Sequence, residues 1–574
     1  MHLLLSILTA LTVLSVPKEK VGTPVLFGSR IVEVNRPHGK VFAPGQRNPR
    51  PQVMLFQRQD NCLVLVPEHP PRNRRMEVKP AVFPIVEETA ESFAIDLEPY
   101  FSTYPEDISA VPPRMLPGPA VEHKLWCPST SPEWLQVNGR YRYQDGLEVT
   151  AACYLLWLRE KPLPPIDLDP SKVGYNSVEG RHPEGRYQRW DLTGGRTLDF
   201  YVDRAFPEEW FPYIKEGIED WNQAFRAIGL GDVLRVHPEP EGLDTASPLV
   251  NMVRYMDVEE SNAKGDVLID PRSGEILQGD ILWWKNVVDL IKDWRYVQTG
   301  AADPEARLAD YPMEMLGPMI RHAVCHEMGH VLGLSHNMGA SWAYPADSLR
   351  DVGFTRHYGT TASVMDYARY NHLATAADVR AGVALLPPRL GPYDYYAIAC
   401  GYGPDPHLEP GPYCYFAPMI SAAIPHDPSA QPESLGNDLL RSSKAGTGNC
   451  RALLALDGLT PERQALLKKY YYRYLSLALS NIGGVTQGKP VTRKVRRQTL
   501  SFVMDALAQV PVQLKDPVQE RIILDELVGN FLPERLVNTV GQKELDHYYR
   551  HLGRLHKKHP ELPLKPFEQW KFNN

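Results

Sequence analysis

The sequence predicts a multidomain α+β protein in which a β-rich N-terminal region, a mixed α/β central domain and an all-α C-terminal region follow one another. The chain has 574 residues, which is more than a single hydrophobic core supports. Short β-rich runs fill the first part, strands and helices alternate after Thr197, and helical spacing dominates from Thr460. These differences in pattern divide the chain into the three regions.

The composition indicates a soluble globular protein, with 43% hydrophobic and 23% charged residues. The formal net charge of -7 is small for this length, and no long run of Lys and Arg marks a nucleic-acid surface. The most basic segment, Lys489 to Arg497, is typical of a solvated stretch beside a helix. We therefore expect no nucleic acid among the partners.

Residues 1–26 allow two interpretations. Leu3 to Val16 is an uncharged apolar stretch of signal-peptide length, but it has no basic segment before it and no small-x-small cleavage site before Pro17. Its β-branched residues also favour the first, buried strand of the N-terminal domain. No other segment approaches the ~20 apolar residues of a membrane helix, so we expect no integral membrane segment beyond such a signal peptide.

Residues 27–160 are predicted to form the β-rich region, because prolines and glycines separate short runs of strand-forming residues. The region contains no recognisable catalytic constellation, so we expect it to pack beside the enzyme domain or to shield it. Residues 161–190, rich in proline, are predicted to be a stiff linker. The predicted strands are Gly28 to Val34, Gln52 to Arg58, Cys62 to Pro67, Ser92 to Leu97, Gln136 to Tyr143 and Leu147 to Leu158.

Residues 191–403 are predicted to form an α/β domain with the functional site at its edge. A helix is expected to begin at Pro207, because apolar residues recur at steps of three and four from Trp210 to Ile228 and Gly229 then ends the pattern. A second helix is expected from Tyr311 to Leu332. The predicted strands are Thr197 to Val202, Val233 to His237, Val250 to Tyr255, and a hairpin of Val267 to Asp270 with Glu275 to Trp284.

The last part of the chain is predicted to be an irregular connector over residues 404–458 and a helical region over residues 459–574. Thr460 and Pro461 are typical of the start of a helix. Further helices are expected at Val495 to Leu507, Pro517 to Leu532 and Glu544 to Lys557.

The motif that carries chemistry runs from His326 to His336 and has the pattern H-E-x-x-H-x-x-G-x-x-H. His326 and His330 stand one helical turn apart, so both imidazoles can reach one metal at the ~2.0–2.1 Å distance of a zinc bond. Gly333 permits a left-handed turn that ends the helix and brings His336 back to the metal. Three nitrogen ligands leave a fourth position for water, which is typical of a catalytic Zn2+ site.

Glu327 follows the first ligand and is expected to be the general base that activates the zinc-bound water. A bare H-E-x-x-H can arise by accident on an amphipathic helix, but the extension to Gly333 and His336 makes that alternative weak. His322 lies on the same helix face, eight residues before His330, or about 12 Å along the axis. Both cannot bind one ion, so His322 is expected to be structural or to support a ligand.

The extended motif, followed by Ser363-Val364-Met365-Asp366-Tyr367, resembles the zinc helix and the Met-turn of the metzincins, a clan that includes astacins, serralysins, matrixins and adamalysins. The resemblance implies a catalytic domain with a twisted sheet, a zinc-binding helix and a Met-turn. It places Met365 beneath the zinc as a hydrophobic floor, a role close to that of an ordinary core methionine. It also implies that Tyr367 stabilises the oxyanion, with plain packing as the alternative.

Asn337 stands where astacins and adamalysins carry an acidic residue, so the chain is no standard member of either group. From about Phe27 to Tyr402, with Gly391-Pro392-Tyr393-Asp394 among the matching segments, it is similar to the zinc-dependent metalloproteases common in Bacteroidetes. That resemblance implies a β-rich N-terminal region and export to the periplasm, the cell surface or the medium. Because many relatives have extra sequence at the front, it favours a domain strand for Leu3 to Val16.

Together these features predict a zinc-dependent metalloendopeptidase that acts on proteins or peptides. A catalytically silent zinc-binding scaffold is the alternative from another class, and the intact Glu327 argues against it. Zinc hydrolysis of a non-peptide amide is a second alternative. The substrate is expected to lie along an edge strand, placed within Glu275 to Trp284, by β-augmentation.

Overall fold

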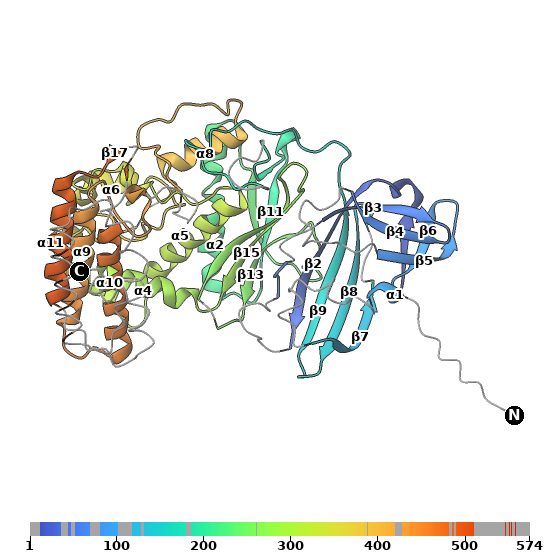
Figure 1. Cartoon of the computed structure of the whole chain (residues 1–574), viewed down its shortest axis with the longest axis horizontal. Coiled ribbons are helices and arrows are strands. Elements are labelled where there is room, and N and C mark those ends of the chain that lie inside the picture. Colours follow the sequence, from blue (N-terminus) through green and yellow to red (C-terminus); the bar gives the residue numbers. More distant parts are fainter. Residues whose placement is uncertain are drawn as a thin grey trace.

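The computed structural model describes residues 12–35, 44–47, 52–68, 81–101, 118–127, 131–178, 185–259, 261–386, 389–418, 427–480, 485–486 and 489–509, with the single residues 546, 550, 553 and 557. Figure 1 shows the β-rich N-terminal region at one end, the central domain in the middle, and helices α9 (Leu439–Leu454), α10 (Pro461–Ser480) and α11 (Arg493–Gln509) at the other end. Within those ranges, no helix has both the length and the apolar character needed to span a bilayer.

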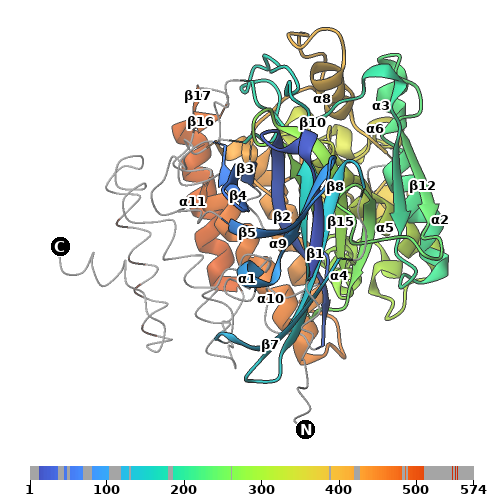
Figure 2. The same cartoon turned by 90° about the vertical axis from the view of Figure 1, so that its right-hand side faces the viewer.

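In the described part of the N-terminal region, nine strands form one antiparallel sheet in the order β1-β6-β5-β4-β3-β2-β9-β8-β7. Figure 2, which faces this region, shows these strands in front of the central domain. Both halves of the sheet contribute to one core, which contains Phe56, Phe83, Tyr141 and Leu155. The elements are β1 (Val13–Pro17), β2 (Pro24–Val34), β3 (Gln52–Gln59), β4 (Cys62–Pro67), β5 (Ala81–Glu88), β6 (Ser92–Asp96), α1 (Glu98–Phe101), β7 (Ala120–Trp126), β8 (Trp134–Tyr143) and β9 (Glu148–Trp157).

The six strands predicted for this region are all present, and β1, β5 and β7 are additional. Strand β1 corresponds to the end of the apolar stretch Leu3 to Val16, and its Leu14 and Val16 are buried against the sheet. Residues 1–11 lie outside the described ranges. Pro84 interrupts the strand pattern of β5, and three consecutive polar residues, Glu122, His123 and Lys124, interrupt that of β7 at the sheet edge.

The central sheet has the strand order β10-β15-β13-β11-β12, and β14 pairs with β15. All pairings are parallel except that between β14 and β15, which is antiparallel. The strands are β10 (Arg189–Trp190), β11 (Leu198–Val202), β12 (Leu234–Pro238), β13 (Asn251–Met256), β14 (Ala263–Ile269) and β15 (Glu275–Trp284).

The prediction that Glu275 to Trp284 is an edge strand is wrong. This segment is β15, and β13 pairs with it on one side while β14 pairs with it on the other. Its nearly continuous burial is typical of an inner strand. Strand β14 lies at the edge of the sheet on that side, since within the described residues β15 is its only strand partner.

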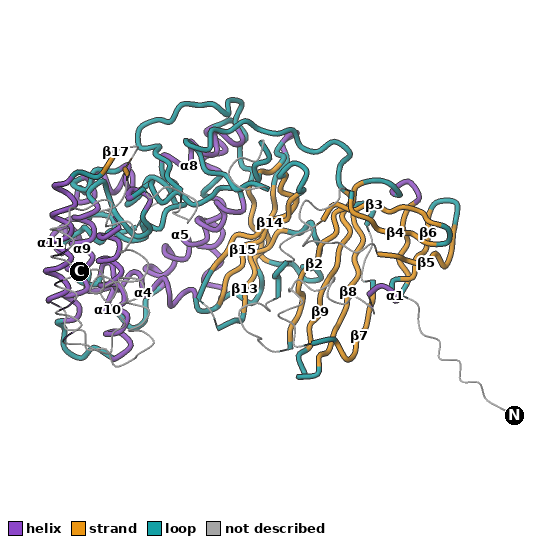
Figure 3. The backbone as a smooth tube through the Cα atoms, viewed as in Figure 1, coloured by secondary structure: helices purple, strands orange, loops and turns teal. Residues whose placement is uncertain are grey.

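Both faces of the central sheet are covered, as Figure 3 shows. The helices α2 (Phe211–Glu219), α4 (Val287–Thr299) and α5 (Met313–Val331) lie on one side. The N-terminal sheet covers the other side, where Leu268 of β14 packs with Leu26, Trp134 and Leu156. The N-terminal region therefore packs directly on the central domain.

The helix predicted from Pro207 to Ile228 is divided into α2 and α3 (Asn222–Ala227). Asp220 and Trp221 between them keep helical backbone angles, so the apolar stripe continues across the break. Helix α4 was not predicted, because its first residues, Val287 and Val288, are strand formers that follow directly on β15.

Residues 161–190, predicted to be a linker, contain no helix within the described residues and run against the central core. Leu168, Val173 and Tyr175 are buried in that core. The amide of Asn176 donates to the carbonyl of Gly333 at 2.8 Å. The segment thus supports the turn at Gly333, inside the motif from His326 to His336.

The C-terminal part is helical, with a small hairpin of β16 (Val485–Thr486) and β17 (Lys489–Pro490). Helix α9 lies inside the segment 404–458, which was predicted to be irregular. Its buried face is made of small and polar residues such as Ser442, Gly446 and Thr447, so it has no apolar stripe to reveal it. The helices predicted at Pro517 to Leu532 and Glu544 to Lys557 lie outside the described residues apart from isolated positions. The remaining helices are α6 (Val352–Tyr358), α7 (Ala376–Ala381) and α8 (Pro392–Tyr402).

Candidate metal centre

Helix α5 carries the first two histidines of the motif and ends as the sequence requires. The amide of Leu334 donates to the carbonyl of Gly329, and the amide of Gly333 to the carbonyl of His330, both at 2.9 Å. This pair of bonds is a Schellman cap, and Gly333 adopts the positive φ of 94° that the cap needs. A Cβ at Gly333 would also overlap the carbonyl oxygen of Gln188. Glycine is therefore required at this position for two reasons, the positive φ and the lack of space for a Cβ.

The turn brings the three histidines together. The Nε2 atom of His336 lies 3.3 Å from Nε2 of His326 and 3.2 Å from Nε2 of His330. Three nitrogens bound to tetrahedral zinc at ~2.0–2.1 Å are held about 3.3–3.4 Å apart. The spacing of the imidazoles therefore matches the spacing that a zinc ion imposes.

The hydrogen bonds of the other ring nitrogens leave the Nε2 lone pairs free. Nδ1 of His326 donates to the carbonyl of Val364 at 2.6 Å, and Nδ1 of His330 donates to the carbonyl of Leu334 at 2.8 Å. Burial lowers the pKa of all three imidazoles, that of His336 to about 3. Neutral nitrogens whose lone pairs converge repel one another unless a cation lies between them, so this donor set suits a divalent metal ion.

Glu327 is buried next to the histidines without being part of their cluster. Burial raises the pKa of its carboxyl to about 7, against the effect of the Gly265 amide, which donates to Oε2 at 2.8 Å. A Cβ at Gly265 would lie 2.5 Å from the carbonyl oxygen of Glu327. Strand β14 can approach the zinc helix this closely only because residue 265 is glycine.

Met365 is fully buried in the turn that follows α6. Its sulfur packs against the backbone of Gly329, and a Cβ at Gly329 would overlap it. Its carbonyl accepts the amide of Asn337 at 3.0 Å. Asn337 also bonds the backbone of Tyr415 and Ala417 through its side chain, which explains why an uncharged amide occupies the position after His336.

Tyr367 lies beside two of the histidines, with its ring centroid 4.8 Å from that of His336 and 5.6 Å from that of His326. The guanidinium of Arg369 lies 4.4 Å from the centre of the Tyr367 ring and 3.4 Å from that of Trp294. Glu433 accepts a hydrogen bond from Arg369 at 3.1 Å. Tyr367 is therefore held at the edge of the site by a cation that is itself fixed.

A cavity of about 150 Å³ opens beside the histidines and Glu327, between β14, α4 and α5. His322 lines it, and burial lowers the pKa of that imidazole to about 4. His322 is not among the three residues whose ligand atoms converge. The apolar residues that line the cavity include Val287, Leu290, Ile291, Trp294, Met319 and Ala323.

Sequence reasoning singled out Asp394 only as part of a matching segment and gave it no role. Its buried carboxylate accepts from the amides of Gly391 and Val364 at 2.8 and 3.0 Å and from the hydroxyl of Ser363 at 2.6 Å. The carbonyl of the same Val364 accepts from His326, so Asp394 fixes the residue whose carbonyl orients the first of the three histidines. The pattern Gly391-Pro392-x-Asp394 is typical of a helix N-terminus and therefore predicts the capping bond of Asp394. It does not predict the bonds of the same carboxylate to Ser363 and Val364.

Gly265 and Arg369 were also missed. Gly265 reaches Glu327 from a strand 62 residues away in sequence, and Arg369 depends on Trp294 and Glu433 from other elements. Neither has a local pattern that could reveal it.

Comparison with protein families finds that residues 309–510 match a family described as Met-zincin. The matched span contains the three histidines, Glu327, Met365 and Tyr367, and it extends through α11. Comparisons with curated proteins and with solved structures find no match.

Proposed function

We propose that this chain, whose residues 309–510 match a family described as Met-zincin, is a zinc-dependent metalloendopeptidase that hydrolyses peptide bonds in proteins or peptides. The observation that supports it most is the convergence of three imidazole nitrogens beside a buried carboxylate. His326, His330 and His336 would hold Zn2+ through their Nε2 atoms and leave a fourth position open.

When bound there, Zn2+ supplies a Lewis acid that acidifies water and polarises the scissile carbonyl. Glu327 takes a proton from the attacking water and passes it to the leaving amine. The Gly265 amide restrains the carboxylate in the orientation needed. The hydroxyl of Tyr367 donates a hydrogen bond to the oxyanion that forms at the scissile carbonyl.

We propose that the peptide lies along β14. The carbonyl of Asn262 accepts from the amide of Trp284 in β15, and the backbone groups of an antiparallel strand point alternately to its two sides. Ala263, Gly265 and Val267 therefore direct their N–H and C=O groups away from β15. The Gly265 N–H is bonded to Glu327, so the groups left for a substrate are those of Ala263 and Val267 and the carbonyl of Gly265. A substrate strand added there would run past Glu327 and place one side chain in the cavity between α4 and α5.

Comparison of the zinc-loaded wild type with Glu327→Ala, using casein and a peptide library, tests the proposal. Metal content is measured for both proteins. Equal zinc content with cleavage lost only in Glu327→Ala is the expected result, because Glu327 is not a ligand. Zinc content near one per chain without cleavage by the wild type would favour a scaffold, and cleavage of small amides but not of peptides would favour a non-peptide amidase.

A further inference from the structure

Two arginines of the N-terminal region are buried where it meets the central sheet. Arg30 belongs to β2, and Arg47 lies on residues 44–47, which run antiparallel beside β2 so that the two arginines are directly opposite each other. Their side chains are only 1% and 4% exposed. Like charges in this position destabilise a pair of strands, and a buried charge needs a partner.

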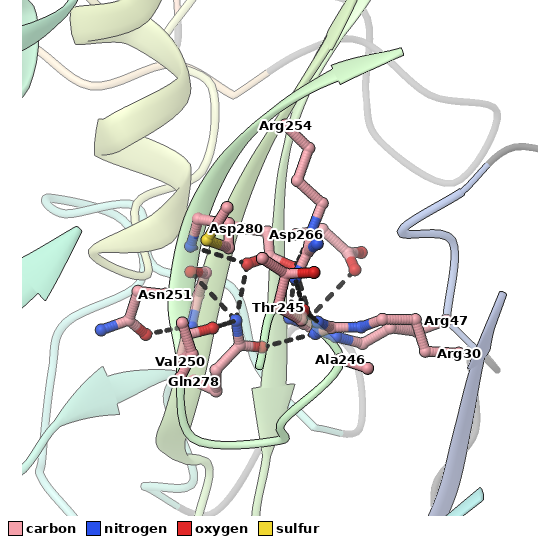
Figure 4. A network of polar contacts seen from close by, with 12 residues as sticks. Arg30, Arg47, Thr245, Ala246, Val250, Asn251, Arg254, Asp266, Gln278 and Asp280 are labelled. Carbon is pink, nitrogen blue, oxygen red and sulfur yellow. Dashed lines mark hydrogen bonds and ion pairs between the residues drawn. The ribbon is translucent and has the colours of Figure 1, made fainter. Parts of the chain in front are cut away.

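The central sheet presents the opposite pair. Asp266 of β14 is directly opposite Asp280 of β15. Two carboxylates in this arrangement repel each other as the two arginines do. Arg30, Arg47, Asp266 and Asp280 face each other across the interface in Figure 4, so each like-charged pair is compensated by the other domain.

Asp280 is the centre of the network. Its Oδ2 atom lies 3.1 Å from Arg30, 2.9 Å from Arg47 and 3.0 Å from Arg254 of β13. Its Oδ1 atom accepts the backbone amide of Met252 at 2.9 Å. The carboxylate has no exposed surface, so removing one partner would leave charge in the interior without compensation.

Arg47 makes a second contact that leads toward the catalytic residues. Its Nη1 atom lies 3.3 Å from Oδ2 of Asp266. Asp266 adjoins Gly265, whose amide binds Glu327. Arg47 thus holds a strand that lies against the proposed base.

We propose that the N-terminal domain is a permanent part of the catalytic unit, and that Arg47 is a positioning residue that holds β14 against the zinc helix through Asp266. The strand then presents Ala263, Gly265 and Val267 in the register that a peptide needs. The first part rests on the ion-pair geometry alone, and the statement about the peptide rests on the proposed function. A removable inhibitory segment would not bury charges that each domain needs from the other.

Hydrogen exchange of the full chain tests the positioning role without any activity assay. The variants are Arg47→Met, Arg47→Lys and Asp266→Asn, with Arg58→Met as the matched control, because Arg58 is an exposed N-terminal arginine paired with Glu88. We expect exchange of the amides of residues 263–269 to rise at least about tenfold in Arg47→Met. Arg47→Lys should recover part of the protection, and Arg58→Met should match the wild type.

Unchanged exchange in β14 of Arg47→Met would overturn the proposal, and so would a rise spread evenly over the chain, which indicates general destabilisation. If Arg47→Met does not fold, Asp266→Asn decides, because it leaves Asp280 and its arginines in place and removes only the ion pairs of Asp266 with Arg47 and Lys264, at a side chain that is 17% exposed. It should raise exchange in the same segment.

Steady-state kinetics test the consequence for the substrate. With a long peptide that can pair with β14, Arg47→Met should raise KM by about tenfold, equivalent to about 1.4 kcal/mol of binding. With a short blocked substrate that spans only the scissile bond, KM and kcat should stay as in the wild type. Equal changes for both substrates would contradict the positioning role. A wild type that cleaves neither substrate would refute the proposed function, while the exchange result still decides the role of Arg47.

Discussion

Tyr367 is the residue whose contacts best separate a catalytic role from plain packing. Its ring is fixed between the histidine cluster and the Arg369 guanidinium. Burial raises the pKa of its hydroxyl, so the group stays protonated and able to donate near neutral pH. A residue that served only to fill space would need the ring and not the hydroxyl.

Tyr367→Phe removes that hydroxyl and keeps the ring. We expect kcat to fall by about 100-fold, the effect of losing one oxyanion donor, while KM and zinc content stay unchanged. Tyr201→Phe, on β11 and with its ring 5.6 Å from that of His237, is the control and should have no effect. Wild-type kcat in Tyr367→Phe would assign Tyr367 to packing.

Gly329 has helical backbone angles that any residue can adopt, but there is no space for a side chain at this position. Gly329→Ala would push a methyl group into the sulfur of Met365. We expect a loss of stability of about 1–3 kcal/mol and weaker zinc binding, because His326 and His330 flank the site of overlap. Gly448→Ala, in α9 with no neighbour within 4 Å, is the matched helical control, and it should stabilise by up to about 1 kcal/mol. Chemical denaturation measures both, and equal effects would refute the steric argument.

At the scale of elements, the turn of residues 363–365 is joined to α8 by Asp394, which also caps that helix. Asp394→Asn keeps the size of the side chain but replaces one acceptor oxygen with a donor, so the three donors can no longer all be satisfied. We expect zinc affinity to fall by about 10–100-fold, as for other groups that orient a ligand. Competition with a chelator measures this effect.

Asp378→Asn is the control for that experiment, because Asp378 caps α7 in the same way but lies on the surface away from the histidines. It should leave zinc affinity unchanged. Equal zinc affinity in Asp394→Asn and the wild type would separate Asp394 from the metal centre.

Elements with a strong local pattern could be predicted from the sequence. Helix α5 was expected at Tyr311 to Leu332 and is Met313–Val331, because its apolar spacing and Gly333 are both local signals. Helix α9 was missed because its buried face is polar, and β5 because of Pro84. The edge strand was misassigned because the pairing of β15 on both sides depends on residues far along the chain.

At the scale of the whole molecule, the burial of Asp280 makes the contact between the two domains sensitive to pH. Burial alone would raise the pKa of its carboxyl, but Arg254, Arg30 and Arg47 lower it well below its usual range. A lowered pKa in the folded state means that Asp280 contributes stability above its unfolded value of about 3.9, and that this contribution is lost as the pH falls below that value.

Asp280→Asn should therefore destabilise the protein by about 3–5 kcal/mol at pH 7, because the three arginines lose their common partner. The difference in unfolding free energy between wild type and variant should shrink as the pH is lowered below about 4. Urea denaturation over a pH series measures it. A difference that does not depend on pH would contradict the role of charge.

The arrangement of the domains could not be predicted from the sequence. Arg47 and Asp280 are 233 residues apart, and nothing in the local sequence of either one indicates its partner. The three histidines lie within eleven residues, and their spacing in sequence nearly determines their spacing in space. Local chemistry was therefore predictable, whereas the contact that supports β14 was not.

The most direct test of the central claim is mass spectrometry of a peptide library incubated with the zinc-loaded chain in heavy-oxygen water. We expect cleavage within peptides, with one heavy oxygen in each new carboxyl group, and no cleavage by Glu327→Gln at equal zinc content. Intact peptides after incubation with the fully zinc-loaded wild type, or equal cleavage by Glu327→Gln, would contradict the claim.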